Sequence, residues 1–351
     1  MRARTIQTAL KLKSVVVDWV FLTSPTAIRY ISGFNGSEGA LLISKDKQYL
    51  LVDGRYTSQA RQQAPEFEVV ECENGILSQL EEFEIRSLGY EAKYMSVKKF
   101  DMINELLPEV ILVDITYLVE DMRECKTEEE VDKLKKAAKI ANQTFSHIRR
   151  YIRPGMSERQ VALEIEYDMR RQGATATSFD TIVASGQRTA MPHAKPTEKI
   201  IEIGDFVMMD FGCVADGYCS DTTRMVIMGQ PTDKQQKIYD IVLEAQLMAL
   251  ANIKEGITAR EADAFARGSI KNAGYGDKFT HSLGHGVGMD VHEKPSVSPK
   301  NENPLKAGMI ISVEPGIYLP GEFGVRIEDV VRVTESGLEN LTTIDKSLIV
   351  I

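Results

Sequence analysis

The chain has 351 residues, which is enough for about two domains of ordinary size. Hydrophobic residues make up 43% and charged residues 26%, which is ordinary globular composition and excludes a disordered chain. The formal net charge of −9 lacks the basic excess that nucleic-acid binding requires, so we exclude nucleic acid as a partner.

Membrane insertion and secretion are not expected either. No stretch approaches about 18 consecutive apolar residues, the length that spans a bilayer. The first 25 residues join basic residues to an apolar run, but Asp18 interrupts the run and no small-residue cleavage site follows. We interpret this region as a strand of the folded protein and not as a signal peptide. The cysteines are too scattered for a disulfide framework or a zinc knuckle and indicate buried thiols in a reducing cytoplasm: Cys72, Cys125, Cys213 and Cys219.

Residues 1–122 alternate short apolar runs with turn residues and predict a small α/β domain. The segment GFNGSEG (33–39) fits neither a phosphate loop nor a dinucleotide fingerprint, so we interpret it as a turn between strands. No catalytic constellation is evident in this half. We expect strands at 15–24, 40–44, 49–54 and 109–114, and helices at 56–63 and 98–107.

A long amphipathic helix begins after the polar stretch 124–127 and marks the domain boundary, so we assign residues 123–351 to a second domain. Thr127 is placed to cap this helix, and three glutamates follow in its first turn, where the helix dipole favours them.

The second domain repeats the same helix signals in two places. Ser157–Gln160 and Thr258–Glu261 each predict a capping box, and the helices that follow end at Gly173 and Gly274. A strand-rich section with a hairpin follows each helix. We interpret this pattern as an internal duplication, which predicts a pseudo-twofold α+β domain with a site between its halves.

The first hairpin carries a pair of carboxylates. Asp216-Gly217 is a strong two-residue turn signal, which places Asp210 opposite Thr223 and makes Asp221 the diagonal neighbour of Asp210 on one face. Both acids interrupt apolar strands, where an unpaired carboxylate is costly. We therefore favour an ion-binding pair over a solvated acidic face.

The second hairpin repeats this feature, because a turn near Gly321 brings Glu314 opposite Glu328 to within a residue or two. Histidines gather between the two hairpins, since three of the five in the chain lie in THSLGHGVGMDVHE. These are His281, His285 and His292; His193 in MPHAKP is a further candidate, and we interpret His147, on the long helix, as ordinary.

Four carboxylates at one site repel each other and raise one another's pKa values unless cations neutralise them. Two divalent ions would cancel the four charges, and oxygen-rich ligation with one imidazole fits Mn²⁺ and is compatible with Co²⁺ or Zn²⁺. Two metals that share a bridging water generate hydroxide at neutral pH. The residues therefore predict metal-assisted hydrolysis.

Four ordered motifs of the second domain resemble those of the proline-specific metallopeptidases with the pita-bread fold: DFG…DGYCSDTTR, HSLGHGVGMDVHE, SVEPGIY and VRIED. This family comprises the Xaa-Pro aminopeptidases and Xaa-Pro dipeptidases. IRYISGFNGSEG and LLVDGRY resemble the N-terminal domain of the same family, so the resemblance covers nearly the whole chain. It implies a small α/β N-terminal domain, a pseudo-twofold pita-bread catalytic domain, and a homodimer formed partly through the N-terminal domain.

The resemblance also implies a ligand set for two metal ions. In that set Asp210 holds one metal, Asp221 and Glu328 bridge both, and His285 and Glu314 hold the other. A bridging hydroxide attacks the carbonyl before proline, and Glu314 accepts a proton.

Further residues receive roles from the same resemblance. His292 and His193 contact substrate and stabilise the oxyanion and the leaving group, although Ala194 follows His193 where relatives usually have glycine. His281 lines the proline pocket. Arg326 orients the neighbouring bridging carboxylate, and Tyr318 acts similarly.

The expected substrates are peptides with proline at the second position. The stretch SFDTIVASGQRTAMPH is more similar to short bacterial Xaa-Pro aminopeptidases than to dipeptidases, so we predict an aminopeptidase, with an Xaa-Pro dipeptidase as the alternative. A pita-bread binding module without catalysis and a structural ion site are the alternatives from other classes. The intact ligand set argues against the first, and the histidine cluster against the second.

Overall fold

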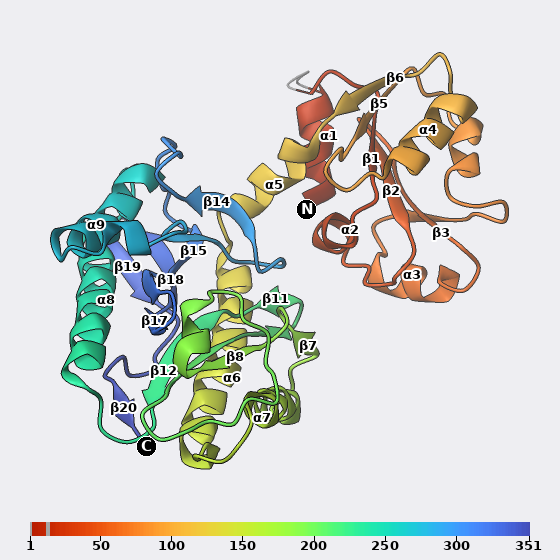
Figure 1. The fold of residues 1–351 in the computed structure, drawn as a ribbon. Helices are drawn as coiled ribbons and strands as arrows, with labels where there is room; N and C mark the ends of the chain where they lie inside the picture. Colours follow the sequence, from red (N-terminus) through yellow and green to blue (C-terminus); the bar gives the residue numbers. More distant parts are fainter. Residues whose placement is uncertain (1, 12–14) are drawn as a thin grey trace. The chain divides into compact units, whose positions relative to one another are not determined.

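The computed structural model describes residues 2–11 and 15–351, and the chain separates into two units, Met1–Asp121 and Met122–Ile351 (Figure 1). Among the described residues, no helix combines the length and the apolar character needed to cross a membrane. The elements of the first unit are α1 (Arg2–Lys11), β1 (Trp19–Leu22), α2 (Pro25–Ser32), β2 (Ala40–Ser44), β3 (Gln48–Val52), α3 (Thr57–Gln63), β4 (Glu68–Glu71), the 3-10 helix η1 (Ser78–Glu82), β5 (Ser87–Tyr90), α4 (Val97–Leu106) and β6 (Ile111–Asp114), and α5 (Thr116–Glu124) crosses the division between the units.

The first unit is built on a six-stranded mixed sheet in the order β4-β3-β2-β1-β5-β6. Strands β1, β2 and β3 pair antiparallel, whereas β5 and β6 join the sheet in parallel. Phe21, Leu42 and Leu51 are fully buried and pack with Trp19 in the core. The predicted α/β layer is therefore confirmed.

One local prediction in this unit is confirmed and one is wrong. The strand predicted at 15–24 contains β1, and the unpredicted helix α1 precedes it, because Ile6 and Leu10 are spaced four apart and bury one face of a helix. Met1 and residues 12–14 lie outside the described residues. The segment 33–39 joins a helix to a strand, since Ser24 caps α2 before it and Gly33, at φ 84°, ends α2.

The second unit contains two helix pairs and their sheets. Its elements are α6 (Glu128–Tyr151), α7 (Glu158–Arg171), β7 (Ala176–Thr177), β8 (Ile182–Ser185), the 3-10 helix η2 (Gly186–Ala190), β9 (Phe206–Phe211), β10 (Cys213–Ala215), β11 (Tyr218–Cys219), β12 (Thr222–Ile227), α8 (Asp233–Asn252), α9 (Ala259–Asn272), the 3-10 helix η3 (Gly276–Lys278), β13 (Gly284–Gly286), β14 (Glu293–Val297), β15 (Ile310–Val313), β16 (Gly316–Leu319), β17 (Phe323–Arg326), β18 (Asp329–Thr334), β19 (Gly337–Asn340) and β20 (Ile349–Val350).

The two halves of this unit are built alike. Capping boxes begin both α7 and α9, as predicted. The residue before each of these helices forms an isolated bridge to a returning segment, Ser157 to Ile200 and Thr258 to Pro304. Helices α6 and α7 contact β8, β10 and β11, while α8 and α9 contact β14, β15 and β19. The structure therefore contains the repeated arrangement that the helix signals predict.

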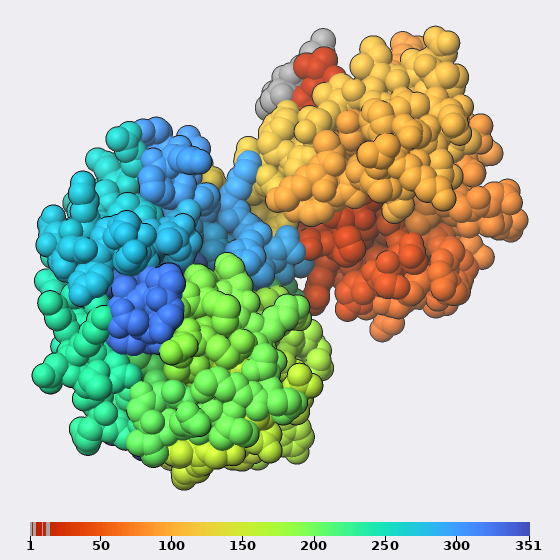
Figure 2. Space-filling model, viewed as in Figure 1, coloured from red at the N-terminus to blue at the C-terminus, as the bar shows by residue number. Residues whose placement is uncertain are grey.

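The halves meet where the predicted acids lie. Strand β12 of the first half contacts β17 and β18 of the second, and the Glu328 N–H donates to the Thr223 carbonyl at 3.2 Å. The β16–β17 hairpin also contacts η2, and Figure 2 shows the segment near residue 320 (dark blue) against the segment near residue 190 (green).

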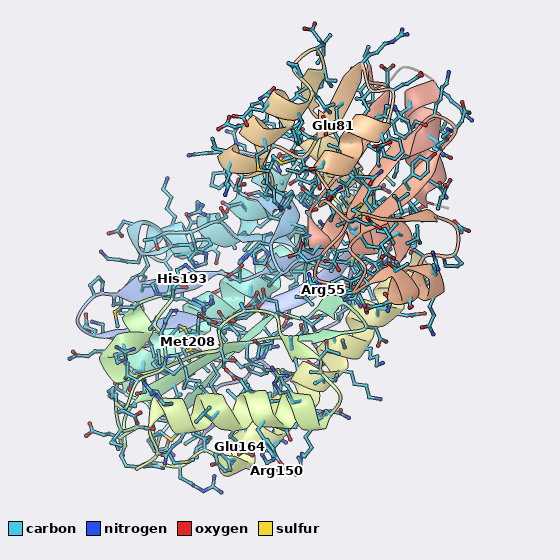
Figure 3. All side chains as sticks on the ribbon, turned by 90° about the vertical axis from the view of Figure 1, so that its right-hand side faces the viewer. Arg55, Glu81, Arg150, Glu164, His193 and Met208 are labelled. Atoms are coloured by element: carbon cyan, nitrogen blue, oxygen red, sulfur yellow. The ribbon has the colours of Figure 1, made fainter. Side chains whose placement is uncertain are left out.

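His147 lies on α6, apart from this junction. Its Nε2 is 2.6 Å from Glu164 Oε1 on α7, and its ring stacks on Tyr151. In Figure 3 Glu164 lies well away from His193.

Candidate active site and metal centre

The first pair of acids is positioned by the register of β9 and β12. The two strands pair antiparallel with Asp210 opposite Thr223, as the Asp216-Gly217 turn predicts. Among the described residues, Asp216 is the one non-glycine residue with a positive φ, at 50°. This conformation fits a type I′ turn. Asp221 directly precedes β12 and lies two residues before Thr223, the partner of Asp210. The two carboxylates therefore lie on the same face, the one that borders the second half.

The second pair flanks the corresponding strands of the other half. β15 pairs with β18 so that Val313 faces Asp329, and β16 pairs with β17 so that Gly316 faces Arg326. Glu314 and Glu328 occupy the matching positions between these pairs. The predicted opposition of the two glutamates is confirmed.

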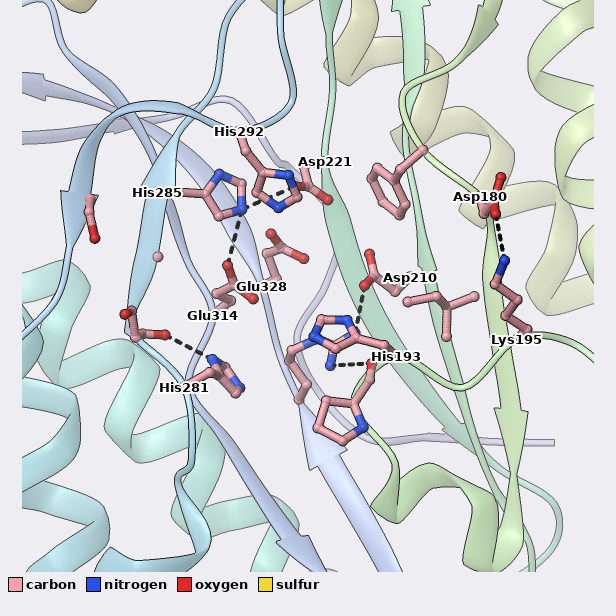
Figure 4. Close-up of a pocket in the computed structure, with 17 residues that line it drawn as sticks. Asp180, His193, Lys195, Asp210, Asp221, His281, His285, His292, Glu314 and Glu328 are labelled. Carbon is pink, nitrogen blue, oxygen red and sulfur yellow. Dashed lines mark hydrogen bonds and ion pairs between the residues drawn. The ribbon is translucent and has the colours of Figure 1, made fainter. Parts of the chain in front are cut away.

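His285 joins these acids. One ligand atom from each of Asp221, His285 and Glu328 lies within 4.8 Å of the others. The His285 Nε2 is 3.3 Å from Glu314 Oε1 and 3.6 Å from Asp221 Oδ2 (Figure 4). The geometry is that of a group able to hold a cation.

Two further details fit a metal centre. Asp210 Oδ1 is buried without a hydrogen-bond partner, which is costly unless a cation takes that place. The His285 Nδ1 lies 3.1 Å from the Gly286 carbonyl, which can only accept, so this nitrogen carries the proton. Nε2 therefore points toward the carboxylates and is the nitrogen that a metal ion would take in place of a proton, as in a metal-binding histidine.

The electrostatics of the protein groups alone show how strongly this site favours a cation. Burial and the neighbouring Asp210 hold the pKa of Asp221 well above its usual range, and burial and Asp221 do the same for Glu328. Burial lowers the pKa of His285, but the hydrogen bond and charge of Glu314 outweigh it and raise that pKa to about 9. Burial opposes ionisation of Glu314, yet His285 lowers its pKa to about 2. The acids thus favour a positive charge at this point of the site.

Arg326 connects the acids of both halves. It is buried, and its Nη2 donates to Asp210 Oδ2 at 2.5 Å while its Nε donates to Thr223 Oγ1 at 3.0 Å. Thr223 in turn donates to Glu328 Oε2 at 2.7 Å. We predicted that Arg326 orients its sequence neighbour Glu328; the direct partner is Asp210, and Glu328 is reached through Thr223. Arg326 ends β17 and Glu328 lies between β17 and β18, whereas Asp210 on β9 lies within hydrogen-bond distance of the guanidinium.

Tyr318 links this arginine to His281. The Tyr318 hydroxyl accepts from Arg326 Nη1 at 2.9 Å and lies 2.9 Å from His281 Nε2. His281 Nδ1 is 2.8 Å from the Ser282 carbonyl and so carries the proton, which leaves Nε2 to accept from Tyr318. Burial lowers the pKa of His281, which keeps the ring neutral.

The four acids, His281, His285 and Arg326 border one cavity of about 520 Å³. His292 lies beside His285, with ring centroids 4.3 Å apart, and burial and His285 lower its pKa. His193 approaches from the loop after η2 (Figure 4). The cavity is lined by Phe179, Asp180, Ile182, Pro192, His193, Lys195, Asp210, Asp221, His281, Ser282, Gly284, His285, His292, Ser296, Glu314, Arg326 and Glu328. The structure thus brings the five predicted metal ligands and the predicted site histidines to one place, and Tyr318 contacts this group through His281 and Arg326.

Sequence reasoning missed several supporting residues. Ser312 donates to Glu314 Oε1 at 3.0 Å and accepts from the His285 N–H, so it ties two predicted ligands together. Its buried place two residues before Glu314 in an apolar strand was a usable signal. Asp180 and Lys195, an exposed ion pair of 3.1 Å at the cavity, lie in loops that carry no such signal.

The loop that carries His193 is anchored by a buried acid. Glu158 accepts from Arg188 Nε at 3.1 Å and from the Thr197 hydroxyl at 2.7 Å. The Arg188 Nη2 also donates to the Lys195 carbonyl at 2.6 Å. The start of α7 therefore fixes both ends of the loop around His193.

Comparison with known proteins agrees with these observations. Residues 132–335 match metallopeptidase family M24, and residues 2–125 match the Creatinase/Prolidase N-terminal domain. A Xaa-Pro dipeptidase from Pyrococcus furiosus is 39% identical, with 95% of each chain covered.

Solved structures agree as well. A Xaa-Pro dipeptidase from Bacillus anthracis is 44% identical, with a TM-score of 0.95 over 100% of this chain and 99% of the other. An X-Pro aminopeptidase from Thermotoga maritima is 39% identical, with a TM-score of 0.90 over 97% of this chain and 99% of the other. The predicted fold, a small α/β domain followed by a pita-bread domain, is confirmed. This chain belongs to metallopeptidase family M24.

Proposed function

We propose that this protein hydrolyses the peptide bond between an N-terminal residue and a proline that follows it. The observation that carries the proposal is the convergence of the four carboxylates and His285 on one cavity that His193, His281 and His292 also face. An Xaa-Pro bond has no N–H, so enzymes that grip the extended backbone handle it poorly. A site that grips the carbonyl instead does not need that hydrogen bond.

The cofactor in this proposal is a pair of divalent ions held by Asp210, Asp221, His285, Glu314 and Glu328. When bound, such ions polarise a carbonyl and lower the pKa of a bound water. The oxygen-rich ligand set favours Mn²⁺, with Co²⁺ and Zn²⁺ as alternatives.

Glu314 is the proposed proton acceptor. Its Oε1 accepts from Ser312, which fixes the carboxylate beside His285, and its low pKa keeps it ionised in the metal-free protein. In the reaction the Glu314 carboxylate takes a proton from the attacking water and passes it to the proline nitrogen as the bond breaks.

The histidines contact the substrate in this proposal. His292 and His193 donate hydrogen bonds to the developing oxyanion and to the leaving group. His281, which borders the cavity, lines the proline pocket; its ring packs edge-on against Phe279, and its Nε2 lies 2.9 Å from the Tyr318 hydroxyl. The Arg326 guanidinium keeps Asp210 oriented as a ligand.

For substrate length we propose an aminopeptidase that accepts peptides longer than two residues. A cavity of about 520 Å³ lies within the range of roughly 300–1,000 Å³ that holds ligands of tripeptide size. The alternative, an Xaa-Pro dipeptidase, is favoured by the names of two similar proteins and by the Lys195 amine at the cavity, which could bind a free carboxylate.

The test is a panel of matched peptides with Mn²⁺ added: Xaa-Pro, Xaa-Pro-Xaa and Xaa-Ala-Xaa. Cleavage of the proline tripeptide at its first bond supports the aminopeptidase, and cleavage of the dipeptide alone supports the dipeptidase. Cleavage of the alanine peptide at the same rate would overturn the proline specificity. A cytoplasmic location and a homodimer formed partly through the first unit remain predictions from the sequence.

A further inference from the structure

The segment between His285 and Glu293 forms a closed loop. Gly286 pairs with Glu293 across its neck, next to a register shift between His285 and Gly286. His292 lies immediately before this closing residue. Because His285 and His292 flank the neck, the geometry of the neck determines how their rings lie relative to each other.

A pair of buried cations holds the neck of this loop. Arg123, near the end of α5, donates through Nη2 to Asp290 Oδ2 at 2.7 Å and also to Glu293 Oε2. Lys126 lies between two helices, two residues before α6 begins at Glu128, and places its Nζ 2.7 Å from Glu293 Oε1. Each carboxylate oxygen of Glu293 therefore has its own cation.

The clamp formed by Arg123, Lys126, Asp290 and Glu293 is well shielded from water. The side chains of Arg123, Lys126 and Glu293 are 6%, 2% and 8% exposed. A Cβ at Gly288 would lie 2.2 Å from Glu293 Oε1, so the carboxylate fills the space that a side chain at 288 would need. Two cations face two acids, so the charges of the clamp balance.

A buried ion-pair network adds little net stability compared with apolar packing. The main effect of the clamp is therefore to fix the orientation of the residues at the neck of the loop. The rest of the loop is held through its backbone. The Cys219 N–H donates to the Gly288 carbonyl at 2.7 Å, and the Val287 N–H donates to the Ile310 carbonyl at 3.0 Å. At the neck beside His292, the clamp adds side-chain support to the strand pairing.

We propose that Glu293 is a positioning residue, which Arg123 and Lys126 hold so that the His292 ring stays beside His285 and over the substrate. The inference rests on the proposed function, in which His292 contacts the substrate. It adds that the segment entering α6 determines the geometry of the active site.

The test uses the full-length protein with Mn²⁺ and a proline tripeptide. Glu293→Gln keeps the shape of the side chain but replaces one acceptor by a donor. Lys126→Met with Glu293→Gln restores the charge balance, in case the single variant does not fold. Glu124→Gln is the matched control, because it breaks the Glu124–Lys306 ion pair of the same segment and leaves the clamp intact.

We expect Glu293→Gln to lower kcat by up to about 100-fold, the scale of a misplaced catalytic group, with bound metal and circular dichroism unchanged. In a His292→Ala background the same substitution should leave kcat unchanged, because the group that it positions is gone. If Glu293→Gln lowers kcat by the same factor in the His292→Ala background as in the wild type, the proposal is overturned.

A second readout does not depend on activity. Amide hydrogen exchange of residues 286–293 should become faster in both Glu293→Gln variants and stay at the wild-type rate in Glu124→Gln. Unchanged exchange in the Glu293→Gln variants would refute the clamp. A wild-type protein that cleaves no proline peptide would refute the proposed function. The exchange rates would still show whether Glu293 holds the neck of the loop in place.

Discussion

Replacing Thr223 by valine tests the connection between the two halves of the site. The substitution keeps the branched shape of a fully buried side chain and removes its hydroxyl. That hydroxyl accepts from Arg326 Nε at 3.0 Å and donates to Glu328 Oε2 at 2.7 Å, so both a cation and a proposed metal ligand lose a partner.

The magnitude follows from these two bonds. A hydrogen bond to a charged group contributes about 1.5–3 kcal/mol, and about 1.4 kcal/mol corresponds to a factor of ten in binding. Loss of the bond to Glu328 should therefore weaken metal binding by roughly 10- to 100-fold, the range found when partners of metal ligands are removed.

The assay is a titration of metal-free protein with Mn²⁺, followed by calorimetry and by peptide hydrolysis. Thr222→Val is the matched control, since Thr222 is equally buried and its hydroxyl makes a long contact of 3.4 Å with the Glu328 carbonyl. Equal Mn²⁺ affinities for the two variants would refute the reasoning.

Three further predictions concern other parts of the second unit. Ser157→Ala and Thr258→Ala should each lower the free energy of unfolding in urea by about 1 kcal/mol, because they cap equivalent helices; a cost at one site alone would contradict the duplication. Lys195→Met should raise KM for an Xaa-Pro dipeptide more than for a tripeptide, since only the dipeptide brings a carboxylate next to its proline ring; equal effects would count against this contact. In metal-free protein, burial disfavours the charged His285, but Glu314 raises its pKa from 6.5 to about 9. The stabilisation is therefore complete below about pH 6.5 and lost as the pH rises through 9, so the metal-free Tm should fall over that interval. A Tm that stays constant there would argue against the ion pair.

Local signals in the sequence were sufficient for much of the fold. The capping boxes at Ser157 and Thr258 and the Asp216-Gly217 turn each depend on a few adjacent residues, and the structure contains all three. The turn also determines the register that sets Asp210 opposite Thr223. Helix α1 was missed because two apolar residues, Ile6 and Leu10, are a weak signal in a basic segment.

Contacts between distant segments were harder to predict. The hydrogen bond from Arg326 to Asp210 joins different halves of the unit, and sequence proximity favoured Glu328 as the partner. The ion pairs of Arg123 and Lys126 with Glu293 join segments that lie far apart in the sequence, and no local pattern indicates them. Such contacts become visible only when the fold brings the segments together.

The most direct test of the proposed metal centre measures metal content and hydrolysis of an Xaa-Pro-Xaa tripeptide in the same samples, from stripped protein to saturation with Mn²⁺. We expect no cleavage by the stripped protein, and cleavage at the Xaa-Pro bond that rises as two ions bind per chain. Full activity in stripped protein, or no cleavage with two ions bound, would contradict the proposal.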